Sequence, residues 1–407
     1  MICRHCNSPL RNQVVDLHFS PPSNSYLTSQ HLAAVEPNYP LKVAVCNECW
    51  LVQTEDFVSA NSMFTEDYAY FSSTSSSWMK HAKDYCDTIT DRLKLDSSSF
   101  VVELASNDGY LLRNFVKEGI RCLGVEPTQS TASAAIDHGV PTVTNFFTER
   151  FAWSILEEHG AADLVIGNNV YAHVPDINDF TKGMKTILAK EGVITLEFPH
   201  LVNLISDTQF DTIYHEHFSY LSLLTVNNIF KRFGLRVFDV ERLSTHGGSL
   251  RVHGCHENSS HKENSSVKAI LEEEVDCGLF KLPTYEAFSQ RTKQCRRKVQ
   301  QFFSTEIAQG QRIVGYGAAA KGNTLLNYCG ITQEDIEFVV DGSSMKQGRF
   351  LPGSHIPIYP PSMLYQRKPD VVVILPWNLE KEISAILRDE MRYDGKIVVL
   401  LPEPRFL

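Results

Sequence analysis

Titratable side chains are densest in the segment YHEHFSY at residues 214–220, which contains two histidines and a glutamate. His215 and His217 lie two positions apart, so they lack the i, i+4 spacing with which a helical HExxH motif binds zinc. A histidine has an intrinsic pKa of about 6.5, which makes it a useful general base at neutral pH. A neighbouring carboxylate such as Glu216 would raise that pKa and orient the ring. This composition indicates a catalytic role for the segment.

A second polar group follows the apolar run at residues 100–104, which predicts a buried parallel strand. The run ends in the turn ASNDG at residues 105–109, a helix-like segment follows, and the next apolar run ends on Glu126. A strand, a turn of small residues, a helix and a strand that ends on an acid are typical of the nucleoside-binding half of a doubly wound sheet. Glu126 can accept hydrogen bonds from both hydroxyls of a ribose.

The turn itself distinguishes between adenosine ligands. A dinucleotide site uses G-x-G-x-x-G so that a pyrophosphate can sit on the helix N-terminus, whereas this turn contains only Gly109. The carboxylates of Glu103 and Asp108 would repel a pyrophosphate but suit the sulfonium and ammonium groups of S-adenosyl-L-methionine. An ordinary strand and turn without a ligand is the alternative. The residues expected to contact the cofactor are Glu103, Ala105, Asn107, Asp108, Gly109, Glu126, Pro127, Asn145, Phe146 and Asn168.

Other segments bring further polar residues toward the same edge of the sheet. Residues 162–167 predict a fourth strand that ends in the sequence NNVYAHV. Because ligands of open α/β sheets bind at the carboxyl ends of strands, we expect Asn169 and His173 to face the position of methyl transfer. Upstream, Tyr68 and Tyr70 share one face of an extended segment, for which packing against the next domain is an equally good explanation.

Four of the ten cysteines form two CxxC pairs, Cys3 with Cys6 and Cys46 with Cys49. Each CxxC makes a tight turn that directs two thiolates toward one point, and two such turns complete a tetrahedral four-sulfur zinc site. Four thiolates leave no open coordination position, so we expect a structural zinc. A redox CxxC would need a thioredoxin-like βαβ setting, which the surrounding sequence lacks.

Residues 310–407 predict a second α/β pattern, with the glycine-rich turn GYGAAAKGN at residues 315–323. The helix after Gly317 offers N–H groups and a positive dipole, and Lys321 adds a charge, which together suit a phosphate. Asp341 lies at a suitable distance for a ribose acid, so an NAD-dependent sugar enzyme is an alternative. The turn and the cations predict a diphosphate partner. Its expected ligands are Tyr316, Lys321, Asn323, Lys346, Arg349 and His355.

Length and composition limit the remaining possibilities. A chain of 407 residues can form two or three domains, each with its own core. The net charge of −10, with no basic stripe, argues against nucleic acid and membrane surfaces as partners. No apolar run reaches the length of about 20 residues that a membrane span needs. Ten cysteines without a secretion signal predict a reducing compartment, and the cytoplasm is the expected location.

These motifs, in this order, resemble the C-methyltransferases of deoxysugar biosynthesis, which make branched sugars of the tetronitrose, mycarose and virenose type. The likeness rests on the cysteine module, the E-L-x-S-x-D-G turn, YHEHFSY, GYGAAAKGN and the KQG and PGSHIPI segments, and it covers nearly the whole chain. It implies S-adenosyl-L-methionine as methyl donor and a nucleotide-diphospho-4-ketosugar as substrate. It implies zinc at Cys3, Cys6, Cys46 and Cys49. It implies a catalytic group of Tyr68, Asn169, His173, Tyr214, Glu216 and His217.

The expected fold is α/β, with a zinc-binding domain at residues 1–80, a class I (Rossmann-like) methyltransferase domain at 81–243 and a Rossmann-like domain at 244–407 that helps to bind the nucleotide sugar. The expected reaction begins when His217 removes the C-3 proton that a 4-keto group acidifies. Glu216 orients or tunes this base, and Tyr214 or His173 donates to the enolate oxygen. An O- or N-methyltransferase and a non-catalytic zinc-containing binding protein are the alternatives.

Overall fold

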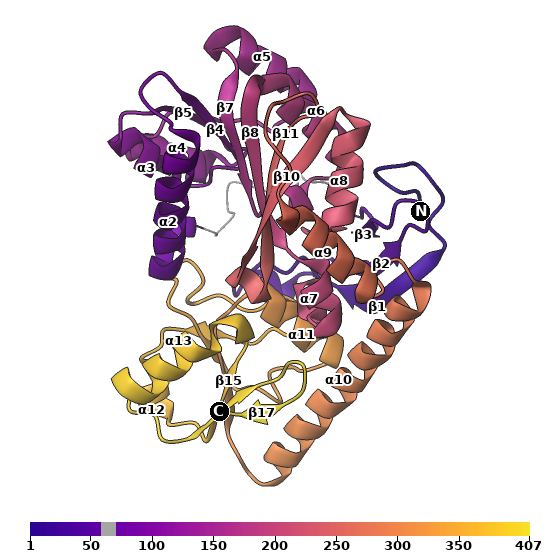
Figure 1. Cartoon of the computed structure of the whole chain (residues 1–407). Coiled ribbons are helices and arrows are strands. Elements are labelled where there is room, and N and C mark those ends of the chain that lie inside the picture. Colours follow the sequence, from indigo (N-terminus) through magenta and orange to yellow (C-terminus); the bar gives the residue numbers. More distant parts are fainter. Residues whose placement is uncertain (58–70) are drawn as a thin grey trace.

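The computed structural model describes residues 1–57 and 71–407, and within them the strands form three sheets (Figure 1). A seven-stranded sheet with its helices forms one lobe, at the top of Figure 1, and a six-stranded C-terminal sheet forms the other. A four-stranded N-terminal sheet lies at their junction, where it packs against the long helix α10 (Leu282–Ala308).

The N-terminal sheet is antiparallel and has the order β1 (Asn12–Ser20), β2 (Tyr39–Val45), β3 (Val52–Thr54), β9 (Ser219–Tyr220). The short helix η1 (His31–Ala33) lies in the connection between β1 and β2. Leu41, Val43 and Val45 are buried at alternate positions of β2, because one face of the sheet packs on the core. Strand β9 comes from the YHEHFSY segment, so the N-terminal sheet anchors the end of that segment.

The seven-stranded sheet has the order β10-β11-β8-β7-β4-β5-β6. Its strands are β4 (Phe100–Leu104), β5 (Arg121–Val125), β6 (Thr142–Val143), β7 (Ala162–Asn168), β8 (Leu188–Pro199), β10 (Leu235–Leu243) and β11 (Ser249–His256). Strands β4 to β8 are parallel, and β10 and β11 add an antiparallel edge. The strand order reverses between β4 and β7: the chain adds β5 and β6 on one side of β4, and then β7 and β8 on the other side. Open α/β sheets bind ligands at such a point.

Helices cover both faces of this sheet (Figure 1). On one face lie α2 (Ser76–Leu93), α3 (Leu112–Lys117) and α4 (Gln129–Asp137); on the other lie α5 (Glu149–His159), α6 (Ile177–Ile187) and α8 (Leu223–Arg232). Side chains of β4 alternate between the two: Val101 packs in the core beneath α2 and α3, while Phe100 and Val102 pack in the core beneath α5 and α6. Burial on both faces explains why every residue of this strand except Glu103 is apolar.

The six-stranded sheet has the order β14-β13-β12-β15-β16-β17 and is parallel except for its last pair. Its strands are β12 (Ile313–Tyr316), β13 (Val339–Val340), β14 (Ile358–Tyr359), β15 (Val371–Ile374), β16 (Lys396–Val399) and β17 (Arg405–Phe406). Its helices are α11 (Ala320–Cys329), α12 (Met363–Arg367) and α13 (Glu380–Ala385), the last extended by the π-helical turn η7 (Ile386–Glu390).

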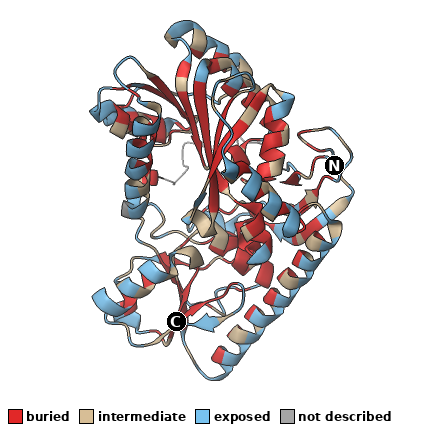
Figure 2. Ribbon diagram, in the orientation of Figure 1, coloured by how far each residue is buried: buried red, intermediate tan, exposed pale blue. Residues whose placement is uncertain are grey.

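The three sheets are not packed as three separate cores. One hydrophobic cluster contains Val43 of the N-terminal sheet, Leu204 of α7 (Leu201–Ser206), Phe303 of α10 and Val373 of the C-terminal sheet. Figure 2 shows this buried junction between the lobes. The N-terminal module therefore depends on the C-terminal domain for part of its core.

Strand β11 completes the seven-stranded sheet by pairing with β8 and β10, although the expected boundary at residue 244 assigns this strand to the third domain. Helix α9 (Ser265–Asp276) likewise packs on β10. None of the described helices combines the length and apolarity needed to cross a membrane.

Candidate active site

The turn after β4 has an unusual backbone. Ala105, Asn107 and Gly109 have φ angles of 56°, 50° and 72°, in the left-handed region that residues other than glycine rarely adopt. Gly109 also lies against Val140, whose Cγ2 atom would be 2.9 Å from an added Cβ. Strained backbone of this kind clusters at ligand sites.

Three carboxylates meet at this turn. Glu126 accepts hydrogen bonds from the main-chain N–H groups of Asn107 and Thr128, both at 2.9 Å, and from the Thr131 hydroxyl at 3.0 Å. A carboxylate has about four acceptor positions, so Glu126 is fixed in place and retains capacity for a ribose hydroxyl. Glu103 is buried, and burial together with the nearby charges of Glu126 and Asp108 raises its pKa well above the usual range.

Several buried polar atoms at this edge have no hydrogen-bond partner among the described residues: Glu103 Oε2, Asp108 Oδ1, Asn168 Oδ1 and both side-chain polar atoms of Asn169. Buried polar atoms left unsatisfied in this way are costly unless a ligand supplies partners, which are donors for the four oxygen atoms and an acceptor for Asn169 Nδ2. The set fits the ammonium and sulfonium groups of the expected cofactor. Asn145 and Phe146 lie exposed at the rim, where the Asn145 N–H donates to the carbonyl of Glu126 at 3.2 Å, and Pro127 is half-buried.

His217 lies in a group of aromatic rings near this edge. Its ring centroid is 3.9 Å from that of Tyr214 and 4.6 Å from that of His173. The Nδ1 atom is 2.7 Å from the main-chain carbonyl of Thr212, in the short helix η4 (Phe210–Thr212). A carbonyl only accepts, so Nδ1 carries the proton and Nε2 has the free lone pair in neutral His217. This is the tautomer that a base needs.

Glu216 does not orient His217, contrary to the prediction. Both carboxylate oxygens of Glu216 accept from Asn24 Nδ2, at 2.9 and 2.7 Å, whereas the His217 ring bonds to the Thr212 carbonyl. The pKa prediction for His217 was also wrong, since burial and the nearby His173 lower its pKa well below the usual range. Burial lowers the pKa of His173 to about 4. Both imidazoles are therefore neutral at pH 7.

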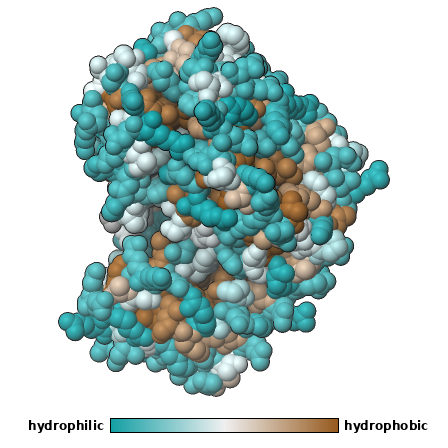
Figure 3. Space-filling model, viewed as in Figure 1, coloured by the Kyte–Doolittle hydropathy of each residue, from teal (hydrophilic) through white to brown (hydrophobic). Residues whose placement is uncertain are grey.

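Two further groups reach this centre from other elements. His246 belongs to η5 (Thr245–Gly247), between β10 and β11, and Lys321 belongs to α11 of the C-terminal domain. The positive charge of Lys321 contributes to the lowered pKa of both His217 and His246, which places the three groups close together. All are half-buried, and Figure 3 shows the surface hollowed between the lobes. Of the predicted substrate ligands, all of which lie in the described part of the chain, Lys321 is thus the one whose charge reaches His217 and His246.

The glycine-rich turn of the C-terminal domain is already occupied by protein groups. Asp341 Oδ2 accepts from the Ala318 N–H at 2.7 Å, where a phosphate or a nicotinamide dinucleotide would otherwise bind. Its other oxygen accepts from the Ser343 N–H at 2.8 Å, so Asp341 is not presented to a ribose. Asn323 is completely buried and donates to the carbonyl of Ser23 at 2.7 Å, so its predicted contact with substrate was wrong.

The other predicted ligands of the diphosphate are dispersed. The Lys346 ammonium donates to the carbonyl of Ala318 at 2.8 Å, and His355 pairs with Glu36 at 2.9 Å. Tyr316, at the end of β12, and Arg349 are half-buried. The guanidinium of Arg349 forms no ion pair or hydrogen bond with the part of the chain that the structure describes. Tyr68 lies outside the described residues.

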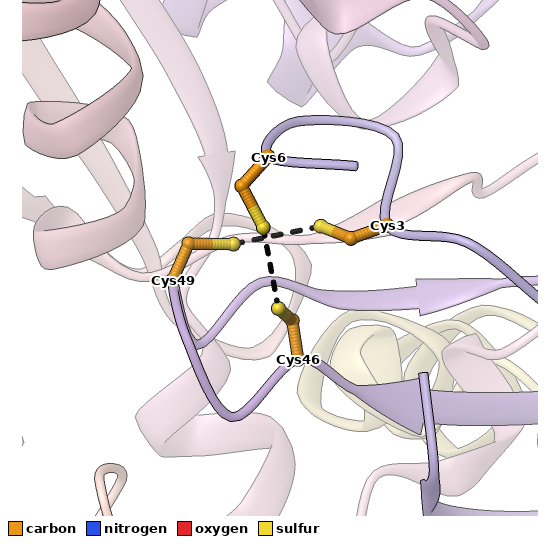
Figure 4. Close-up of side chains that lie close together, drawn as sticks. All are labelled: Cys3, Cys6, Cys46 and Cys49. Carbon is orange, nitrogen blue, oxygen red and sulfur yellow. Dashed lines mark hydrogen bonds between the residues drawn. The ribbon is translucent and has the colours of Figure 1, made fainter. Parts of the chain in front are cut away.

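The four predicted metal ligands do meet. The sulfur atoms of Cys3, Cys6, Cys46 and Cys49 all lie within 4.8 Å of one another, and the Cys3–Cys49 and Cys6–Cys46 pairs are 3.5 Å apart (Figure 4). A tetrahedral zinc with Zn–S bonds of about 2.3 Å needs sulfur atoms about 3.8 Å apart. Gln53 donates to Cys3 Sγ at 3.3 Å, the kind of outer contact that holds a ligand in place.

Family profiles match the chain in three consecutive parts: a zinc-binding domain over residues 3–64, a methyltransferase domain over 78–240 and a C-methyltransferase C-terminal domain over 244–402. The C-methyltransferase NovU of Streptomyces niveus is 36% identical over 405 residues, which cover 100% of this chain and 96% of NovU. The chain belongs to the C-methyltransferase family. It is a methyltransferase that uses S-adenosyl-L-methionine, and its four-cysteine cluster is the zinc site.

Solved structures with lower similarity include an S-adenosylmethionine-dependent methyltransferase from Clostridium acetobutylicum, with 13% identity over 44% of this chain and 92% of that chain, at a TM-score of 0.36. Magnesium protoporphyrin IX methyltransferase from Synechocystis, with bound SAH, has 12% identity over 43% of this chain and 83% of that chain, at a TM-score of 0.34.

The C-methyltransferase has three residues at this centre that the sequence did not single out: Asn24, His246 and Trp377. Trp377 donates to Asp211 at 2.7 Å, and its ring lies 4.9 Å from the Lys321 ammonium. His246 has a φ of 53° and precedes two glycines, a local signal that marked a tight turn but not a site. Nothing local marks Asn24 or Trp377, since their partners are far away in the sequence.

Proposed function

We propose that this C-methyltransferase adds a methyl group to C-3 of a nucleotide-linked 4-keto-6-deoxyhexose, the nucleotide being thymidine diphosphate, with His217 as the base. The observation that carries this proposal is the hydrogen bond from His217 Nδ1 to the Thr212 carbonyl, 2.7 Å long, which directs the basic Nε2 away from the backbone. A C-methyltransferase must first make a carbon nucleophile, and a fixed neutral imidazole is suited to remove a proton from carbon.

The order of events follows from the neighbours of His217. A 4-keto group acidifies the C-3 proton, and Nε2 accepts that proton while negative charge develops on the 4-oxygen. Tyr214 and His173, whose rings contact His217, would donate hydrogen bonds to that oxygen. S-adenosyl-L-methionine supplies the methyl group to the resulting carbanion. Protonation of His217 in a site with lowered pKa is unfavourable, so the proton must leave before the next turnover.

The C-terminal domain is proposed to hold the nucleotide diphosphate near Lys321. The ammonium donates to Asn378 Oδ1 at 2.8 Å and lies within electrostatic range of His217, which links nucleotide binding to the reacting carbon. We also propose a division into three domains, with β11 belonging to the methyltransferase sheet in which it pairs rather than to the third domain. A cytoplasmic location is supported by ten cysteines without a disulfide.

Exchange of the C-3 proton with solvent deuterium, measured by mass spectrometry without methyl donor, tests the base. Wild type should exchange this proton, and His217→Asn should lose most of the exchange. His138→Asn, a change at an exposed histidine, should behave like wild type. Exchange at the wild-type rate in His217→Asn would show that another group is the base.

A panel of nucleotide 4-ketosugars with a labelled methyl donor tests the substrate. The expected product carries the label on C-3. Label on an oxygen or nitrogen would instead establish an O- or N-methyltransferase.

A further inference from the structure

The N-terminal module sends one segment into the junction between the two lobes. Residues 21–27, called the strap here, follow β1 and begin with Pro21 and Pro22, whose fixed φ angles favour an extended chain. The strap continues to Leu27, whose N–H and carbonyl exchange hydrogen bonds with Phe350 of the C-terminal domain at 3.0 and 2.8 Å.

Both ends of the strap are bound to the C-terminal domain. The carbonyl of Ser23 accepts from buried Asn323 at 2.7 Å, and its hydroxyl is 3.2 Å from that of Thr324. The buried Tyr26 hydroxyl donates to the carbonyl of Ala318 at 2.6 Å. These contacts hold Asn24, one of the two residues between Ser23 and Tyr26, in a fixed position.

Asn24 faces Glu216 of the catalytic segment. Its Nδ2 atom is 2.9 Å from one carboxylate oxygen and 2.7 Å from the other. Glu216 is only 3% exposed, and among the described residues no other side chain donates to its carboxylate. The backbone of Glu216 also forms a hydrogen bond with the ring of His173. Asn24 is thus connected through Glu216 to the histidine pair.

We propose that Asn24 is a positioning residue of the active site, whose side-chain amide holds Glu216, the residue between His215 and His217, in place. The zinc module then serves the reaction directly, because it supplies the strap that carries this amide. This inference rests on the proposed function, which assigns His217 and its neighbour His173 to the reacting centre.

The ionisation of Glu216 makes the proposal measurable. Burial raises its pKa to about 7, although the hydrogen bonds from Asn24 act in the opposite direction. The titratable groups around it are neutral near that pH: His173 and His217 have lowered pKa values, and burial raises the pKa of Tyr26. Lys346 and Asp341 face Tyr26 from the C-terminal domain. Removal of the amide donors must raise the pKa of Glu216 further.

The test is the pH dependence of kcat/KM for methyl transfer to the ketosugar in wild type, Asn24→Ala and Ser25→Ala. In Asn24→Ala, the part of the kcat/KM profile that changes near pH 7 should shift to higher pH by about one unit or more, because a hydrogen bond to a charged group is removed. Ser25 is exposed on the same strap, so Ser25→Ala should reproduce the wild-type profile. If Asn24→Ala does not fold, Asn24→Ser keeps one donor and should give a smaller shift in the same direction.

The same shift should be seen without substrate, by NMR titration of the Glu216 side-chain carbon in 13C-glutamate-labelled protein. An active wild type with identical profiles and identical Glu216 titration in the Asn24 variants would overturn the inference. A uniform loss of activity at every pH, with no change in titration, would also overturn it. An inactive wild type with a shifted titration would refute the proposed function instead and leave the Asn24–Glu216 contact supported.

Discussion

Replacement of Gly109 by alanine should destabilise the cofactor turn through two effects, a strained backbone conformation and a steric clash. The structure allows the free-energy cost of each effect to be derived separately. Gly109 has a φ of 72°, and an alanine held in the left-handed region costs about 1–2 kcal/mol. The new Cβ would also lie 2.9 Å from Val140 Cγ2 and 3.1 Å from Ala135 Cβ. Overpacking of this kind costs about 1–3 kcal/mol, so the expected loss in free energy of unfolding is about 2–5 kcal/mol.

Gly119 provides a matched control for this prediction. Its φ is 70°, and an added Cβ would meet no atom within 4 Å. Gly119→Ala should therefore lose only the conformational part, about 1–2 kcal/mol, and the effect of alanine on the unfolded chain should cancel between the two variants.

Urea unfolding of wild type and both variants measures the difference, and calorimetric titration with S-adenosyl-L-methionine measures the turn directly. Gly109→Ala should be the less stable variant and should bind the cofactor more weakly than Gly119→Ala. Equal stability losses in the two variants, or unchanged cofactor affinity in Gly109→Ala, would refute the assignment of this turn.

Three further results are expected. Cys46→Ser should lower the zinc content measured by atomic absorption and reduce the unfolding temperature, because a four-thiolate site contributes its binding free energy to folding; full zinc content would contradict the cluster. His173 has a pKa of about 4 when folded and about 6.5 when unfolded, so the unfolded chain binds more protons between these values. The contribution of His173 to the free energy of unfolding is complete above about pH 6.5 and should be lost as the pH drops toward 4. Unfolding midpoints measured at several pH values should therefore fall less steeply in His173→Phe than in wild type. Lys321→Met should raise the pKa of His217 in an NMR titration, since the lysine charge contributes to lowering it; an unchanged pKa would mean that Lys321 does not face the histidines.

The features that could be recognised from the sequence consist of residues that lie close together in the chain. Cys3 and Cys6 form one knuckle through local turn geometry, and the second pair repeats it. The apolar run at residues 100–104, the small-residue turn and Glu126 lie within one strand–helix–strand unit, so their spacing predicts their meeting. Gly109 is a further example, because a turn position that requires a positive φ favours glycine whatever the rest of the fold.

The predictions that were wrong concern hydrogen-bond partners that the sequence did not indicate. Sequence proximity suggested that Glu216 orients His217, yet the Thr212 carbonyl holds the ring and Asn24 holds the carboxylate. The glycine-rich turn at residues 315–323 suggested an open phosphate site, yet Asp341 occupies the Ala318 N–H. In both cases a nearby protein group satisfied a polar atom that the sequence had left available.

The sequence by itself determined the chemistry present in this C-methyltransferase: four thiolates at zinc spacing, an acidic adenosyl turn and a histidine-rich segment. Local backbone geometry and side-chain periodicity are sufficient to recognise these features, since each CxxC pair, the turn after β4 and the histidine-rich segment consist of residues a few positions apart. Only the tertiary structure decided which groups complete the centre. Asn24, His246 and Lys321 come from three different parts of the chain, and the shared core between the N-terminal sheet and the C-terminal domain brings them together.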